Sequence, residues 1–64
     1  NMAKYYATSA DYYALVSDYT SAIKSADRAL SVLTENDKAE ISRLEALKLT
    51  YRKRLSYIQE LKGK

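Results

Sequence analysis

The chain has 64 residues, of which 47% are apolar and 30% charged, and it carries a formal net charge of +3 at pH 7. A chain of this length forms one domain at most and buries only about 60% of its unfolded surface, so we expect marginal stability. It contains no Cys and no His, which excludes disulfides, thiolate metal sites and the commonest general base. The composition is typical of a folded helical domain, and the mild positive charge does not require nucleic acid.

The first predicted helix covers residues 3–16. Its main apolar stripe recurs at steps of three and four residues, which is the spacing of one helical face. The stripe consists of Ala3, Tyr6, Ala7, Ala10, Tyr13 and Ala14. Because most of its members are small, this helix can pack closely against its neighbours. A second flank, to one side of the stripe, carries Tyr5, Tyr12 and Val16.

We predict that the helix breaks at Ser17 and Asp18. Both are weak helix formers and strong N-caps, since their short side chains can bond the free N–H groups of a first turn. We place Asp18 as the N-cap of a second helix over 19–33. The alternative is one continuous helix over 3–33, because neither Gly nor Pro marks the break.

The longest predicted helix covers residues 37–62. It contains no Gly or Pro, and an apolar stripe with helical spacing follows it through Leu44, Tyr51 and Leu55. Asn36 is the expected N-cap, and Gly63 provides the C-terminal signal after Lys62. No segment alternates in the manner of a strand. Because short connections force antiparallel neighbours, residues 1–64 are expected to form a single all-α domain, a three-helix antiparallel up-down-up bundle.

The sequence contains few residues suited to catalysis, so we expect a non-enzymatic module without catalytic residues, metal or cofactor. The carboxylates do not face one another in pairs, and the only Gly is Gly63, so no phosphate-binding loop exists. Arg52, Lys53 and Arg54 form a basic run, but on a helix they point about 100° apart and do not make one patch. We therefore expect no nucleic acid. No apolar run approaches the roughly 20 residues of a membrane span, and no secretory signal is present.

Apolar surface left over after the stripes are buried points to peptide binding. On the long helix this surface is one margin of the stripe, and on the first helix it is the tyrosine flank. If the two face each other, they line a groove between the first and third helices that suits a short peptide. The candidate peptide-binding residues are Tyr5, Tyr12, Val16, Leu47, Thr50, Arg54, Tyr57 and Leu61.

Two segments resemble the microtubule-interacting and trafficking (MIT) domain family. In residues 18–33 the match is carried by Asp18, Tyr19, Ala22-Ile23 and the ending Ala29-Leu30-x-x-Leu33. Residues 51–61, YRKRLSYIQEL, resemble the third helix of MIT domains in archaeal cell-division AAA ATPases, relatives of the vacuolar-sorting ATPase. Tyr5, Ala7 and Ala10 fit the first helix loosely.

The resemblance implies a monomeric three-helix module that binds C-terminal tail peptides of ESCRT-III-type filament proteins. It implies delivery of an attached effector, such as an AAA ATPase, for polymer remodelling in membrane scission or cell division. Such a module is cytoplasmic and meets membranes only indirectly, through its filament partner. The alternative is a structural unit, either tetratricopeptide-like or an oligomerisation hairpin, without a peptide site.

Two positions depart from the family pattern. The usual hairpin Gly is replaced by Val16-Ser17-Asp18. Arg52 stands where eukaryotic members have an exposed Leu that anchors helical motifs between the second and third helices. Because a charged head cannot replace that apolar anchor, the sequence favours the groove between helices one and three.

Overall fold

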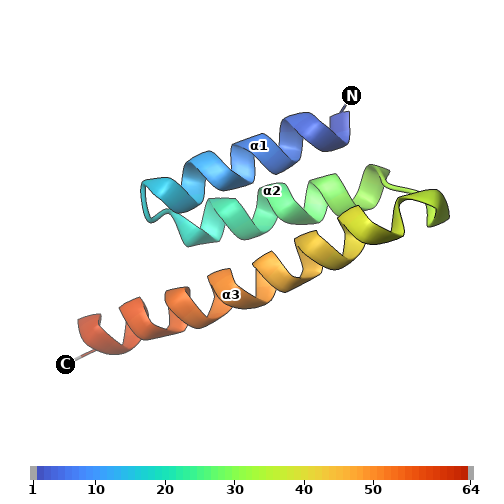
Figure 1. The fold of residues 1–64 in the computed structure, drawn as a ribbon. Helices are drawn as coiled ribbons and strands as arrows, with labels where there is room; N and C mark the ends of the chain where they lie inside the picture. The colour runs from blue at the N-terminus through green and yellow to red at the C-terminus, as the bar shows by residue number, and fades with distance from the viewer. Residues whose placement is uncertain (1, 64) are drawn as a thin grey trace.

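The computed structural model describes residues 2–63, which form three antiparallel α-helices (Figure 1). α1 spans Met2–Leu15, α2 spans Tyr19–Val32 and α3 spans Lys38–Lys62, with a short 3-10 turn, η1, over Glu35–Asp37. The part of the chain that the structure describes contains no strand. The expected all-α three-helix bundle is therefore confirmed. The predicted helix bounds differ from the observed ones by at most one residue.

The turn between α1 and α2 is a tight C-cap followed at once by an N-cap. Ser17 has a φ of 64°, and its N–H donates to the Ala14 carbonyl at 3.0 Å, while the Asp18 N–H donates to the Tyr13 carbonyl at 2.8 Å. This pair of bonds around a left-handed residue is the Schellman motif. The Asp18 carboxylate then accepts from the Ser21 N–H at 3.2 Å. The predicted break and cap are confirmed, and the continuous helix over 3–33 is wrong.

Both ends of α3 correct the sequence prediction. The N-cap of α3 is Asp37, not Asn36, and Thr34 caps the preceding η1: the Thr34 hydroxyl accepts from the Asn36 N–H at 3.4 Å, and Asp37 accepts from the Thr34 N–H at 3.0 Å. This capping box closes η1 before α3 begins, so Asn36 lies inside the 3-10 turn. At the other end Gly63 has a φ of −74°. It therefore ends the helix without the left-handed conformation that favours glycine.

Packing of α1 on α2 is built from alanines. The buried residues of α1 are Ala3, Ala7 and Ala10, and those of α2 are Ala22, Ser25, Ala26 and Ala29. Small side chains let two helices approach closely, and the layer of side chains buried between them is thin. The hairpin of α1 and α2 is therefore thin.

The longer helix α3 packs on α2 through larger side chains. Within residues 2–63, Leu44 is the only large side chain that is fully buried, and the Tyr51 ring lies 5.9 Å from that of Tyr19. Lys48 of α3 forms an ion pair with Asp27 of α2. α2 thus lies between its two neighbours, while α1 and α3 do not pack extensively against each other (Figure 1). The carboxyl end of α3 extends past the turn between α1 and α2.

The left-handed conformation at Ser17 generates a stability prediction. A non-glycine residue pays about 1–2 kcal/mol in this region, so Ser17→Gly should raise the free energy of unfolding by about 1 kcal/mol. Chemical denaturation monitored by circular dichroism measures this change. Ser17→Val is the opposing variant, because a β-branched side chain is strained at positive φ. Equal stability of all three proteins would contradict the turn geometry.

Candidate functional site

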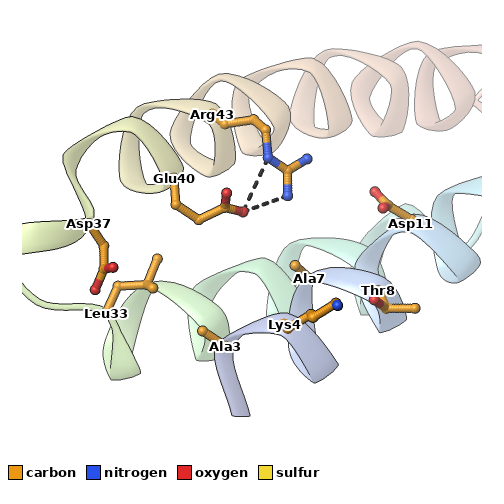
Figure 2. Close-up of a pocket in the computed structure, with 9 residues that line it drawn as sticks. All are labelled: Ala3, Lys4, Ala7, Thr8, Asp11, Leu33, Asp37, Glu40 and Arg43. Carbon is orange, nitrogen blue, oxygen red and sulfur yellow. Dashed lines mark hydrogen bonds and ion pairs between the residues drawn. The ribbon is translucent and has the colours of Figure 1, made fainter. Parts of the chain in front are cut away.

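A cleft opens between α1 and the first half of α3, with a volume of about 480 Å³ (Figure 2). We call it the α1–α3 cleft. Small side chains of α1 form part of its wall, and charged side chains from both helices surround it. It is lined by Ala3, Lys4, Ala7, Thr8, Asp11, Leu33, Asp37, Glu40 and Arg43. The cleft exists because α1 and α3 both pack on α2 without closing on each other.

The charges around this cleft are largely engaged. The Arg43 Nη2 and Nε groups donate to Glu40 Oε1 at 2.6 and 3.1 Å, and the Asp11 carboxylate lies across the cleft from this pair (Figure 2). The hydrogen bond with Glu40, reinforced by the negative charges of Glu40 and Asp11, raises the pKa of Arg43 above its ordinary value. Asp37 is held by its capping bonds to Thr34. The cleft is therefore a mixed-charge site with a permanently cationic Arg43.

Tyr51 is the core residue most sensitive to this charge pattern. Burial raises the pKa of its phenol above the ordinary value of 10.0, the Asp11 carboxylate raises it further, and Arg43 opposes both. A buried phenol with a raised pKa is neutral at physiological pH. Tyr51 lies in the core together with Leu44, as its position in the apolar stripe predicts.

A second, smaller cleft of about 290 Å³ lies where the turn between α1 and α2 meets the second half of α3. We call it the turn cleft. Its walls combine apolar and aromatic surface with two cations and no acidic residue. It is lined by Ser17, Tyr19, Lys53, Arg54, Tyr57 and Ile58.

One row of α3 side chains connects the two clefts. Glu40 and Arg43 line the α1–α3 cleft, and Arg54 and Tyr57 line the turn cleft. Steps of three and four residues join them, so they share one side of the helix. This cleft row consists of Glu40, Arg43, Leu47, Thr50, Arg54, Tyr57 and Leu61. All five candidate residues predicted on the long helix belong to this row, but only Arg54 and Tyr57 line a cleft, whereas Leu47, Thr50 and Leu61 line neither.

The structure does not bring the three α1 candidates to either cleft. Tyr5, Tyr12 and Val16 are each more than half exposed on the side of α1 away from the cleft lining. The residues of α1 that line the cleft, among them Lys4 and Asp11, come one position earlier in the sequence. Since one residue turns the helix by about 100°, the tyrosine flank faces outward. A role of the tyrosine flank in peptide binding stays a prediction.

Four residues of the turn cleft were missed by the sequence reasoning, namely Ser17, Tyr19, Lys53 and Ile58. Tyr19 and Ile58 belong to apolar stripes, and stripes are first interpreted as core. The 100° separation of neighbouring residues predicts that Lys53 and Arg54 diverge, but the structure places both in the lining of this cleft, without Arg52. The available signal was the spacing of Lys53 and Arg54, each one helical turn before an apolar residue, Tyr57 and Ile58 respectively.

Comparisons with protein-family models, with curated proteins and with solved structures gave no match. Within residues 2–63, no helix is long and apolar enough to cross a membrane. The same residues contain no group of three or more acidic, His or Cys side chains able to hold a metal ion. Functional inference therefore rests on the geometry of the clefts and on the resemblance of the two segments.

The raised pKa of Tyr51 predicts a specific loss of stability at high pH. The folded state holds the phenol proton more tightly than the unfolded state does, so this contribution is complete below pH ~10 and is lost as pH rises through the higher folded pKa. Tyr51→Phe keeps the ring and removes the proton, so its stability should fall less steeply above pH ~10. Urea unfolding of both proteins at neutral and alkaline pH measures the difference, and identical alkaline slopes would contradict it.

Proposed function

We propose that this domain is a non-catalytic protein-interaction module that binds a short tail segment of an ESCRT-III-type filament protein. The tail lies along the cleft row of α3. The module delivers an attached effector, an AAA ATPase, to the filament for remodelling in membrane scission or cell division. It acts in the cytoplasm as a monomer and meets membranes through its partner. The resemblance of residues 18–33 and 51–61 to MIT domains supplies the partner class.

The observation that carries this proposal is the unfilled side of α3. The cleft row runs beside two open clefts, and its last apolar members, Tyr57 and Leu61, are more than half exposed. On the neighbouring face of α3, Leu44 and Tyr51 are buried in the core against α2. Apolar side chains next to concave, partly charged surface are the usual anchors of peptide recognition.

Substitutions on the cleft row should weaken binding of a filament tail peptide. Tyr57→Ala and Leu61→Asp remove exposed anchors, and each should raise the dissociation constant about tenfold, as truncation of an interface anchor does. Fluorescence titration with a labelled tail peptide measures this, starting from a dissociation constant of about micromolar order.

The chain offers matched controls for both variants. Leu49 is 56% exposed and Leu61 54%, but Leu49 lies off the cleft row. Tyr12 is 61% exposed and Tyr57 62%, but Tyr12 lies on the outward side of α1. Leu49→Asp should therefore leave the affinity unchanged. Tyr12→Ala decides whether the tyrosine flank takes part, and equal loss from all four variants would contradict a site on α3.

The outward side of α1 favours one second candidate, a structural oligomerisation unit. Its exposed residues follow steps of three and four along the helix without a single charge, as a helix-pairing seam does. The exposed members are Met2, Tyr5, Tyr12 and Val16, and the partly buried Ser9 lies between Tyr5 and Tyr12 in this row. Sedimentation equilibrium over a range of concentrations separates the candidates. A one-chain mass throughout supports the binding module, and a dimer abolished by Tyr12→Asp supports the structural unit.

A further inference from the structure

We propose that the turn cleft selects a partner segment in which an acidic residue adjoins an aliphatic residue. Lys53 and Arg54 bind the carboxylate, and the apolar neighbour packs against Tyr19, Tyr57 and Ile58. This inference rests on the proposed function and specifies the chemistry of its partner. It adds Tyr19 and Lys53, which contribute to none of the predicted peptide sites.

The two ends of α3 differ in charge. Within α3, residues 38–45 include two acidic and two basic residues, whereas residues 46–62 include five basic residues and one acidic residue. The cleft at the basic end has no acidic residue in its lining. The Asp18 carboxylate, which lies between Ser17 and Tyr19 in the sequence, already accepts the Ser21 N–H as the cap of α2.

Both cations of the turn cleft are available to a partner. The ion pairs formed within residues 2–63 join Arg43 to Glu40 and Lys48 to Asp27, so neither Lys53 nor Arg54 belongs to one. Two adjacent cations without a counter-charge attract an anion, and a carboxylate that accepts from both gains charge-assisted hydrogen bonds. The complementary charge must come from the partner.

The shape of the site favours a polypeptide over a membrane surface. The turn cleft is a hollow between two chain segments, with Ser17 and Tyr19 on one side and α3 on the other. One side chain can enter such a hollow, while a flat bilayer cannot follow it. On α3 each cation precedes an apolar residue by one turn, Lys53 before Tyr57 and Arg54 before Ile58. A bound acid and its aliphatic neighbour would meet these two kinds of group side by side.

Amide chemical shifts of the isotope-labelled domain test this proposal directly. The probe is a short, soluble peptide with a Leu-Glu-Leu core, compared with the same peptide carrying Leu-Gln-Leu. We expect shifts that cluster on Tyr19, Lys53 and Tyr57. The Gln peptide, and the double variant Lys53→Gln/Arg54→Gln with the Glu peptide, should each weaken binding about twofold to fivefold, within the range for exposed charge pairs.

A second double variant controls for net charge. Lys38→Gln/Arg52→Gln removes one Lys and one Arg from α3 outside the turn cleft, so it should retain the affinity for the Glu peptide. On Lys53→Gln/Arg54→Gln the Glu and Gln peptides should bind equally, because coupling between partners vanishes when one is removed. Equal loss from both double variants, or no preference for Glu over Gln on the unmodified domain, overturns the proposal.

Two further measurements keep this result separate from the proposed function. If filament tail peptides bind along α3 without any dependence on their acidic residues, the proposed function stands and the carboxylate site fails. If the probe peptide binds as described but no filament tail does, the site stands and the filament partner fails. Vesicles of phosphatidylserine and phosphatidylcholine provide the lipid arm. Binding to them that requires Lys53 and Arg54, without binding of the Glu peptide, overturns a polypeptide partner.

Discussion

The contact of alanine on alanine between α1 and α2 sets the dimensions of this domain. Ala22, Ala26 and Ala29 of α2 are fully buried, and the buried side chains of α1 are also alanines, Ala3, Ala7 and Ala10. Because the side chain of alanine is a single methyl group, the two helices lie close together. Larger residues at these positions would force the helices apart. The thin hairpin cannot surround a third helix. α3 therefore packs on α2, and a cleft is left beside α1.

Because α3 is longer than the hairpin of α1 and α2, part of its apolar surface stays uncovered. α3 has 25 residues, whereas α1 and α2 have 14 each, so its last turns extend past the end of the hairpin. Leu44 and Tyr51 satisfy the packing requirement in the first part of the helix. The apolar residues further along, Tyr57 and Leu61, are left largely exposed beside cations. The residues of α3 that stabilise the fold and the apolar residues that remain exposed thus lie in two different stretches of one helix.

The sequence predicts the helices and the cleft row but not the rotation of α1. Asp18 signals the break through its own chemistry, and the spacing of residues 40–61 defines one side of α3 whatever covers it. On α1, by contrast, either flank of the alanine stripe could face α3. Hydrophobicity suggested the flank with Tyr5 and Tyr12, but the structure turns Lys4 and Asp11 inward. A stripe of small residues predicts that two helices approach closely, but it does not indicate which flank of the helix faces a third helix.

Local cap chemistry also limits what the sequence alone can locate. Thr34 and Asn36 are both good caps, and the choice of Thr34 depends on its reciprocal bond with Asp37. The turn cleft depends in the same way on the left-handed residue Ser17, which places Tyr19 opposite Tyr57 and Ile58. Such a site combines residues that are distant in sequence, so it becomes visible only when the turn geometry is known.

The central claim is that a partner segment lies along the cleft row of α3, and paramagnetic relaxation tests it most directly. A filament tail peptide that carries a nitroxide label, bound to the isotope-labelled domain, broadens the amide signals near its path. The account predicts broadening centred on Leu47, Arg54, Tyr57 and Leu61, with signals around Tyr5 and Leu49 preserved. Broadening centred on the outward side of α1, or spread evenly over the three helices, would contradict it.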